Sequence, residues 1–227
     1  MRKISKRFTF LKTQLKFLQY TYLDAIKLIK NLATAKFLES LEIHIALNID
    51  PKQANQQVRS TLILPHGPIN KKKIAVFTEN TKDALTWGAN VAGTDLIIEQ
   101  ILAQKLEFDI LITTPQYMPK LLPFSKILGP KGLMPSLKSG TLVPNLQLAL
   151  AELKKGKIEY KADKGGVIHI LFGKSNYSEK QLAENLLAIY FSIEKNKPLS
   201  VKGKYFKSAY ICSTMSPSIN IELASFK

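Results

Sequence analysis

The sequence predicts a mixed fold that is α+β in its two flanks and α/β in its middle. Both flanks carry strands in which apolar and polar residues alternate, for example at 41–49, which is typical of a sheet with one buried face. The middle alternates short apolar strands with helices, the pattern of a parallel sheet. We therefore expect a split α+β domain built from the N- and C-terminal segments, residues 1–66 and 157–227, with a Rossmann-like α/β domain inserted at residues 67–156.

The first flank should begin with a helix and continue with two strands. Thr21 and Asp24 have the spacing of a helix-capping pair, and apolar residues follow at helical intervals. These apolar residues are Tyr22, Ile26, Ile29 and Ala33. The strands are expected at 41–49 and 60–64, and the Pro- and Gly-rich segment 65–68 marks the first domain boundary.

The middle should contain strands at 74–78, near Val91 and at 108–113. Helices are expected at 82–87, 96–103 and 145–155, and Gly156 stops the last of them. The apolar face of the helix at 96–103 is assigned to Ile97, Ile98, Ile101 and Leu102.

A loop rich in glycine and proline, at residues 126–141, lies between the strand at 108–113 and the helix at 145–155. Its glycines and prolines disfavour both a helix and a regular strand. Interleaved apolar residues should pin it to a core, and its charges are Lys126, Lys131 and Lys138, with no acid anywhere from 110 to 151. A rigid cationic loop suits an anionic partner. The alternative is a solvated loop whose lysines only maintain solubility.

The second flank returns to an antiparallel pattern. Residues 158–162 and 167–172 are expected to form a hairpin around the turn at 163–166. A long helix should start after Ser178, because Gln181 stands at capping-box spacing. Two final strands are expected at 205–213 and 219–223.

Charge is the anomaly in the composition. The 227 residues include 33 Lys and Arg against 17 Asp and Glu, a formal net charge of +16. A polyanion would neutralise this self-repulsion, and nucleic acid is a better candidate than an anionic membrane surface. No apolar stretch is long enough to span a bilayer, so we expect no membrane partner. The basic segment 1–16 is expected to be an arm that lies along a phosphate backbone, and the alternative is an organellar targeting peptide, which would be short and poor in serine.

The sequence gives no support for catalysis, a metal or a cofactor. His44, His66 and His169 lack metal-ligand spacing with one another and with the single cysteine, Cys212. Gly173-Lys174-Ser175 resembles the end of a phosphate-binding loop, but Ile168 occupies the place of the required glycine. One cysteine indicates a reducing compartment, and Cys212 is expected to pack as a small apolar side chain in a strand, with a catalytic thiol as the alternative.

Four segments together resemble the large-subunit ribosomal protein L1 (uL1) family over nearly the whole chain. They are Thr34-Ala35-Lys36-Phe37, Asn48-Ile49-Asp50-Pro51, the Leu128-to-Pro135 part of the Gly/Pro loop, and Thr214-Met215-Ser216-Pro217-Ser218. Phe172-Gly173-Lys174, Asn196-Lys197-Pro198 and the run from Lys207 to Cys212 look most like the plastid branch. The resemblance therefore implies a plastid ribosome, with a bacterial cytoplasm or a mitochondrial matrix as alternatives.

The resemblance also implies a function. Family members are structural constituents of the large ribosomal subunit and bind its 23S-type rRNA at a mobile stalk. The rest of the ribosome is therefore also an expected partner. They contact deacylated tRNA and help it leave the exit site, and some bacterial members also bind their own mRNA. A free-standing RNA-binding regulator of translation is the alternative, and a nucleotide-dependent enzyme that uses the α/β insertion is a third hypothesis.

The family motifs assign an rRNA-binding surface to Phe37, Thr214 and Met215, where an aromatic ring and a thioether can make apolar contact with exposed bases. The other residues assigned to it are Lys36, Ser40, Glu42, Arg59, Lys164, Lys174, Ser208 and Ser216. The alternatives are that Phe37 belongs to the core, that Met215 fills a gap and that the lysines are solvated. Two positions depart from the family pattern. Ser216 stands where the family usually has glycine, and Ser136-Leu137 stands where it usually has Asn-Pro. Lys126, Lys131 and Lys138 are assigned to a contact with tRNA or with the seam between the domains.

Overall fold

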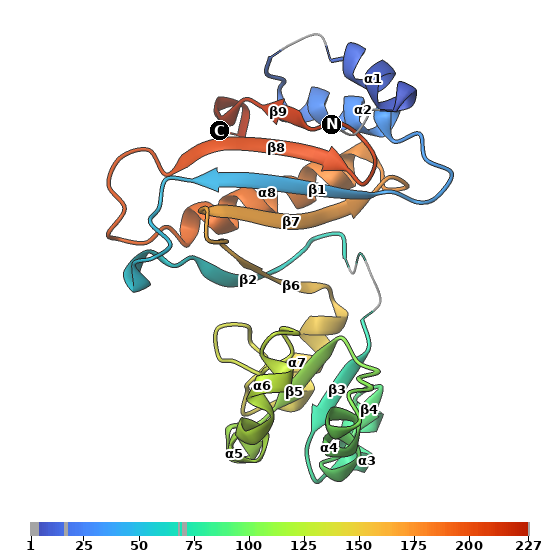
Figure 1. The fold of residues 1–227 in the computed structure, drawn as a ribbon, viewed down its shortest axis with the longest axis vertical. Helices are drawn as coiled ribbons and strands as arrows, with labels where there is room; N and C mark the ends of the chain where they lie inside the picture. Colours follow the sequence, from blue (N-terminus) through green and yellow to red (C-terminus); the bar gives the residue numbers. More distant parts are fainter. Residues whose placement is uncertain (1–4, 16–17, 68, 70–71, 227) are drawn as a thin grey trace. The chain divides into compact units, whose positions relative to one another are not determined.

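The computed structural model describes residues 5–15, 18–67, 69 and 72–226. Contacts between residues divide the chain into two compact units, Met1–Ile69 with Tyr160–Lys227, and Asn70–Glu159. These divisions fall near the expected boundaries after residues 66 and 156. The first unit is α+β and is built from both ends of the chain, and the second is α/β (Figure 1), so the predicted mixed fold is confirmed.

The first unit is built on a four-stranded antiparallel sheet with the order β7-β1-β8-β9. Its strands are β1 (Ser40–Leu47), β7 (Val167–Lys174), β8 (Phe206–Ser213) and β9 (Ile219–Ile221). Alternate residues of each strand are buried, as the period-two pattern predicts. On β1 the buried residues are Leu41, Ile43, Ile45 and Leu47. We call this buried side the inner face of the sheet, and the opposite side the outer face.

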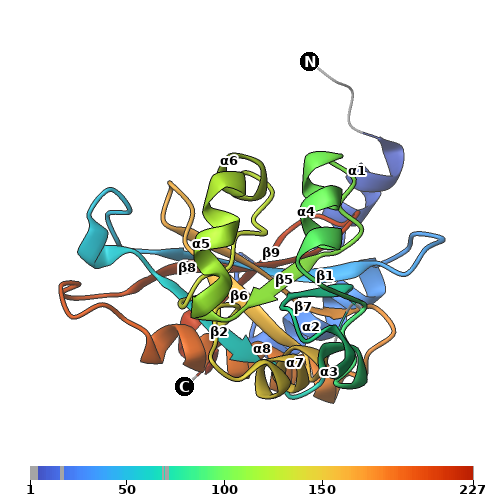
Figure 2. The same cartoon turned by 90° about the horizontal axis from the view of Figure 1, so that it is seen from below.

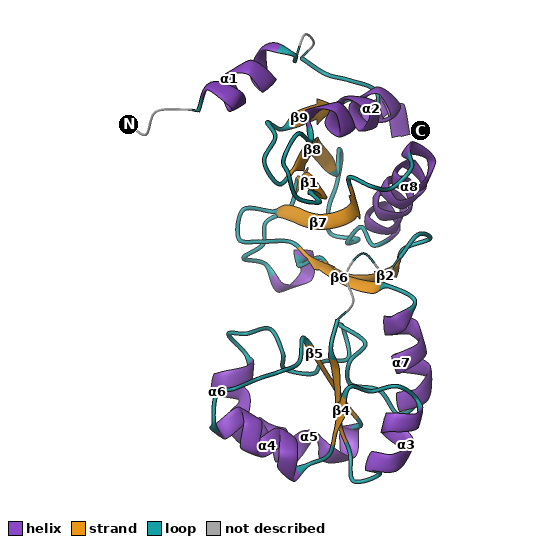
Figure 3. Cartoon of the chain, turned by 90° about the vertical axis from the view of Figure 1, so that its right-hand side faces the viewer, coloured by secondary structure: helices purple, strands orange, loops and turns teal. Residues whose placement is uncertain are grey.

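Two helices cover the inner face, α2 (Tyr22–Leu32) and α8 (Glu179–Lys195) (Figure 2 and Figure 3). Thr21 caps α2, and Ser178 and Gln181 form the expected capping box of α8. Both helices bury a row of aliphatic side chains, for example Ile29 and Ile189. Burial of one such side chain contributes about 1.5–3 kcal/mol, so packing rather than helix propensity holds these helices on the sheet.

The expected basic arm at 1–16 is helical in its described part, α1 (Lys6–Thr13), while residues 1–4 and 16 lie outside the described residues. Ser5 accepts a hydrogen bond from the backbone N–H of Phe8 (3.2 Å) and caps this helix. Sequence analysis missed α1 because its apolar residues form no clear helical stripe.

The expected hairpin at 158–172 is wrong in its pairing. Strand β6 (Lys157–Lys161) pairs with β2 (Arg59–Ile63), whereas β7 pairs with β1. Strands β6 and β7 are connected by an isolated bridge between Ala162 and Ile168 and by turn bonds such as that from Asp163 N to Val167 O (2.9 Å), but they do not form a regular ladder. The backbone groups of the two strands are taken up by different partners, and turn residues cannot predict such long-range pairing.

The second unit has a three-stranded parallel sheet with the order β4-β3-β5. Its strands are β3 (Ile74–Phe77), β4 (Val91–Ala92) and β5 (Ile110–Thr113). Helices α3 (Thr81–Thr86) and α7 (Leu146–Lys154) pack on one face, and α4 (Asp95–Leu102), α5 (Met118–Leu121) and α6 (Ser125–Leu128) on the other (Figure 2 and Figure 3). Burial on both faces explains why these strands are continuous apolar runs.

The structure corrects two details of this unit. Leu102 is 64% exposed and does not belong to the apolar face of α4, which is made by Ile97 and Ile101 with the partly buried Ile98 packed beside them. Lys126 and Leu128 at the start of the Gly/Pro segment are helical, because Gly129 N donates to Ser125 O (2.8 Å) before Pro130 stops the helix.

The rest of the Gly/Pro segment is irregular and anchored, as predicted. Leu128, Leu133 and Met134 pack into the core beneath it. The hydroxyl groups of Ser136, Ser139 and Thr141 form a hydrogen-bonded cluster, with Oγ–Oγ distances of 2.6 Å between Ser136 and Ser139 and 2.8 Å between Ser139 and Thr141. Ser136 therefore fixes the turn by hydrogen bonds. Lys126, Lys131 and Lys138 are all exposed.

Candidate nucleic-acid interface

The outer face of the four-stranded sheet is the candidate interface. Its side chains come from the alternate positions of three strands and are half-buried or exposed. They are Glu42 and His44 of β1, His169 and Leu171 of β7, and Ser208, Tyr210 and Cys212 of β8. Polar groups on an open sheet surface can contact a folded RNA by shape without prior rearrangement.

One end of this face brings together the segments before β1 and after β8. Ser40 pairs with Lys174 on one side, and Leu41 pairs with Ser213 on the other. Thr214 N donates to Ser40 O (3.1 Å), and Ser40 N donates to Thr214 Oγ1 (3.1 Å). We call this region the aromatic end and define it as residues 34–40, Lys174 and residues 213–217.

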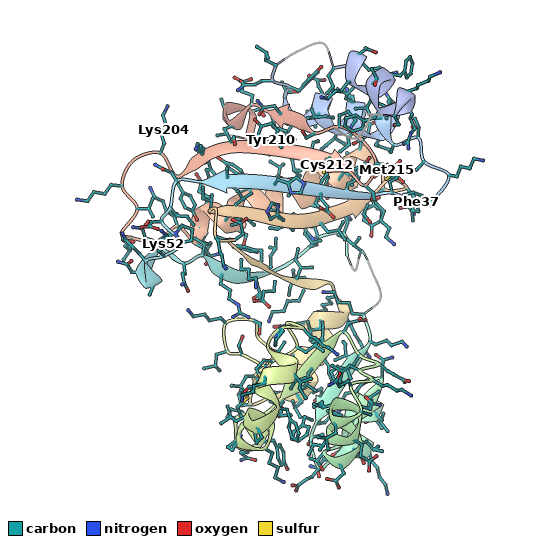
Figure 4. The ribbon with its side chains drawn as sticks, in the orientation of Figure 1. Phe37, Lys52, Lys204, Tyr210, Cys212 and Met215 are labelled. Atoms are coloured by element: carbon teal, nitrogen blue, oxygen red, sulfur yellow. The ribbon has the colours of Figure 1, made fainter. Side chains whose placement is uncertain are left out.

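Three large apolar side chains are exposed at the aromatic end, and one of them is Leu38, which is 48% exposed. The other two are Phe37, which is 54% exposed, and Met215, which is 50% exposed. Figure 4 shows both at the same end of the sheet. Neither is a core side chain, which removes the alternatives in which Phe37 belongs to the core and Met215 fills a gap. Exposed rings and thioethers of this kind are suited to contact with unstacked bases.

A buried carboxylate, Glu39, joins the two segments that carry Phe37 and Met215. Its side chain is 1% exposed. Its Oε1 accepts a hydrogen bond from Ala35 N (2.8 Å), and its Oε2 accepts from Ser213 Oγ (2.6 Å) and Met215 N (3.0 Å). Three bonds to one carboxylate therefore fix both segments at once.

Burial alone would raise the pKa of Glu39, but hydrogen bonds from Ser213, Ala35 and Met215 outweigh it and hold that pKa below its usual range. Arg7 of α1 adds a weaker attraction, with its Nη2 3.8 Å from Oε1 of Glu39. The carboxylate is thus charged at neutral pH, which makes its hydrogen bonds stronger than neutral ones.

Sequence analysis did not single out Glu39, although a signal was present. Residue 39 has the same parity as Leu41 and Ile43, so it continues the buried face of β1. A charged residue at an inward position must be paired, and that requirement identifies it. Its partners could not be read from the sequence because Ser213 and Met215 lie at the other end of the chain.

A chain of hydrogen bonds crosses the middle of the outer face. The Nδ1 atoms of His44 and His169 lie 2.7 Å apart, and His44 Nε2 lies 3.1 Å from Cys212 Sγ. Burial and the neighbouring His169 lower the pKa of His44, so the neutral ring is favoured. Burial, and then the charge of Glu42, raise the pKa of Cys212. Cys212 therefore contacts a histidine and does not pack as a purely apolar side chain, and its raised pKa disfavours a thiolate.

The structure divides the residues that were assigned to the rRNA surface. Seven lie at the aromatic end, and Glu42 follows on the outer face of β1. The seven are Lys36, Phe37, Ser40, Lys174, Thr214, Met215 and Ser216. Ser208 pairs with Ala46 at the opposite end of β1, about 20 Å away at roughly 3.4 Å per residue. Lys164 precedes β7 at that same opposite end, and Arg59 lies on β2, outside this sheet.

Ser216 closes its own turn. Its Oγ accepts from Ser213 N (2.9 Å) and donates to Pro217 O (3.1 Å). The serine that departs from the family glycine therefore uses its hydroxyl to fix the segment next to Met215.

The remaining chemistry is sparse. In the described ranges, no group of three or more histidine, cysteine or acidic side chains could hold a metal ion. None of the helices in the described part of the chain is both long and apolar enough to cross a membrane. Lys126, Lys131 and Lys138 belong to the second unit, whereas the aromatic end belongs to the first.

Comparisons with known proteins agree with the motifs. The model of the ribosomal protein L1p/L10e family matches residues 29–217. The large ribosomal subunit protein uL1c of Phaeodactylum tricornutum is 51% identical, with both chains covered completely, and that of Guillardia theta is 48% identical over 100% of this chain and 98% of its own. The large ribosomal subunit protein uL1 of Prochlorococcus marinus (strain MIT 9515) is 45% identical over 98% of this chain and 96% of its own.

Proposed function

Because the chain belongs to the ribosomal protein L1p/L10e family, we propose that its first unit binds large-subunit rRNA at the mobile stalk through the aromatic end. Membership makes it a structural constituent of the large ribosomal subunit rather than an enzyme, and its uL1c relatives place it in the plastid ribosome. What we propose is which rRNA segment is bound and which residues bind it.

The observation that carries this proposal is the exposure of Phe37 and Met215 on segments that Glu39 holds together. A surface that is already ordered loses little conformational entropy on binding. Exposed apolar side chains then gain contact with unstacked bases, which are the parts of an RNA that proteins read most readily. This favours a folded RNA with splayed bases over a regular duplex.

Charge supports the same conclusion. Lys36 and Lys174 lie beside Phe37 and Met215, and the chain has a net charge of +16. Phosphate contacts of this kind position an RNA without reading its sequence. Glu42 on the outer face offers an acceptor for a ribose 2′-OH, the group that distinguishes RNA from DNA.

The second unit is proposed to contact deacylated tRNA and to help it leave the exit site. Lys126, Lys131 and Lys138 are exposed around a segment that apolar side chains and serine hydroxyls hold in place. Replacement of all three by glutamine should change the dissociation rate of deacylated tRNA from the exit site of plastid ribosomes. An unchanged rate would remove tRNA release from the proposal.

Protection mapping of large-subunit rRNA tests the stalk assignment. Ribosomal particles with and without the protein are treated with a backbone-cleaving reagent, and protection is expected in the stalk segment. A transcript of that segment should also bind the protein more tightly than a transcript of equal length from elsewhere in the rRNA. Equal affinity for both transcripts, or protection elsewhere, would overturn the assignment.

A further inference from the structure

A second cationic surface lies at the end of the sheet opposite the aromatic end. The segment between α8 and β8 carries lysines at positions 197, 202 and 204, the flanking ends of α8 and β8 add Lys195 and Lys207, and no carboxylate stands between residues 195 and 207. Figure 4 shows Lys204 and Lys52 at this end, away from Phe37 and Met215. We propose that this end binds phosphate groups of the same RNA that contacts the aromatic end, an inference that rests on the proposed rRNA binding.

The segment has a defined shape. Val201 and Tyr205 are 7% and 6% exposed and anchor it to the unit. Lys197 Nζ donates to Gly203 O (3.3 Å) and lies 5.9 Å from the centre of the Tyr205 ring. Gly203 has φ +78°, a conformation that glycine adopts without strain, so the chain turns between Lys202 and Lys204. Both of these lysines are exposed on a folded turn.

Two other loops are hydrogen-bonded to this segment or to the strand beside it. Ser200 Oγ donates to Asn55 O (3.3 Å), which joins it to the loop that carries Lys52. In the preceding part of that loop, Asn48 N donates a hydrogen bond to Tyr205 O (2.8 Å). Leu47 N donates to Gly166 O (2.9 Å) and brings in the turn that carries Lys164. We call residues 48–57, 163–166 and 197–205 together the lysine end.

The acids of the lysine end are already used by its own loops. Asp50 accepts from Lys52 N (3.1 Å) and Gln53 Nε2 (3.3 Å). Asp163 accepts from Gly165 N (2.9 Å) and Val167 N (2.7 Å), and the bond from Val167 N contributes most to lowering the pKa of Asp163.

In the described part of the chain, four lysines of these loops have ammonium groups with no anionic partner. Within the described residues, no carboxylate lies within 4.0 Å of the ammonium groups of Lys52, Lys164, Lys202 and Lys204. Unpaired exposed lysines on a folded surface are the groups that neutralise phosphates.

The two ends would act differently on one RNA. The aromatic end contacts bases, whereas the lysine end neutralises backbone charge about 20 Å away along β1. Contact at both ends would fix the direction of the RNA along the sheet, which contact at one end alone would leave free. This assigns a role to Lys164, which the structure separates from Phe37.

The double substitution K202Q/K204Q tests the inference. Binding of the stalk transcript is measured at several KCl concentrations. If each lysine neutralises one phosphate, the slope of log K against log[KCl] should become shallower by about 1.4–1.8, and affinity near 0.15 M salt should fall about 15- to 30-fold. Lysine-modification mass spectrometry should also show both residues protected in the wild-type complex.

The matched control is K27Q/K82Q, which removes two exposed lysines from α2 and α3. It gives the same net charge, so an effect of overall charge alone would be the same in both variants. Equal slopes for the two variants, or an unchanged slope for K202Q/K204Q, would overturn the inference while wild-type binding stays intact. If the wild type does not prefer the stalk transcript, the proposed function fails and this inference fails with it.

Discussion

The aromatic end and the lysine end of the first unit differ in both chemistry and construction. The aromatic end exposes Phe37 and Met215 on segments held by a buried charge. The lysine end exposes ammonium groups on loops held mainly by backbone hydrogen bonds. At the first end, position decides the contact, because a gap of about 0.5–1 Å already removes a quarter to a half of the attraction between apolar groups. At the second end charge decides, and it acts over a Debye length of about 8 Å.

This difference explains why one end needs an interior support and the other does not. Glu39 loses its hydration on burial and is stabilised there mainly by three well-placed donors, with a weaker attraction from Arg7. Such a costly group is useful where it holds two loops in register. Lysines that meet phosphates tolerate small shifts, so Lys202 and Lys204 need only a folded turn.

The substitution Glu39→Gln should have the largest effect. An amide offers one acceptor oxygen in place of two, so at least one of the donors Ala35, Ser213 and Met215 loses its partner. We expect the free energy of unfolding to fall by about 2–4 kcal/mol. The affinity for the stalk transcript should fall about as much as in the double variant F37A/M215A. Denaturant titration and filter binding measure the two quantities.

Asn185→Ala is the matched control for Glu39→Gln. Asn185 is also fully buried and makes three hydrogen bonds, to the backbone of His66 and Phe172, which are not among the residues that define the aromatic end. It should lower stability similarly and leave the RNA affinity of the folded protein unchanged. Glu39→Gln added to F37A/M215A should weaken binding no further, and an additive loss would show that Glu39 does not act through these side chains.

Replacement of Phe37 or Met215 by alanine should come next in effect. Each substitution should weaken binding of the stalk transcript by about 1–3 kcal/mol, through the loss of contact with bases. Stability should change little, because both side chains are half-exposed. Phe191→Ala is the control, since Phe191 is 52% exposed on α8, which covers the inner face. Unchanged affinity in both variants would remove the aromatic end from the interface.

Lys164→Gln and Lys174→Gln compare the two ends directly. Lys174 lies at the aromatic end and Lys164 at the lysine end. Each variant should make the salt dependence of binding shallower by about 0.7–0.9 if its lysine neutralises one phosphate. A shallower slope for Lys174→Gln alone would confine the RNA to the aromatic end. Lys27→Gln should leave the slope unchanged.

The smallest effect is expected from a change of pH, which alters stability through the protonation of His44, between the two ends of the sheet. The pKa of His44 is lowered below about 6.5, so the unfolded chain binds a proton at a higher pH than the folded protein does. Stability should therefore be full above about pH 6.5 and fall as the pH decreases through the window below it. The charged or titratable groups around this ring are Glu42, His169, Asp163, Tyr210 and Cys212.

Denaturant titrations from pH 5 to pH 7.5 measure this dependence. His44→Gln should flatten it, because glutamine takes up no proton. The same curve for wild type and variant would assign the dependence to another group.

Much of the fold could be predicted from local patterns. Thr21, Ser178 and Gln181 mark helix starts by spacing alone, and alternation along β1 identifies its buried face. The parallel sheet of the second unit followed from alternating strands and helices. The helices at 118–128 were missed because their prolines suggest a break, although a proline is tolerated in the first turn of a helix.

The candidate site was less accessible to sequence analysis. Phe37 and Met215 were found through family motifs, but no local pattern indicates that Glu39 bonds to Ser213, or that Lys164 lies far from Phe37. Both facts depend on strand register between distant parts of the chain. The pairing of β6 with β2 was missed for the same reason.

The split construction of the first unit has a consequence for synthesis. Phe37 and Glu39 leave the translating ribosome well before Ser213 and Met215, which lie more than 170 residues further along the chain. Strand β1 lacks both of its neighbours until the second flank has emerged, because it pairs with β7 and β8. A nascent chain therefore cannot present the completed aromatic end, and contacts this distant in sequence form late. If the aromatic end binds rRNA as proposed, a chain interrupted before β8 lacks the surface that would join it to a large subunit.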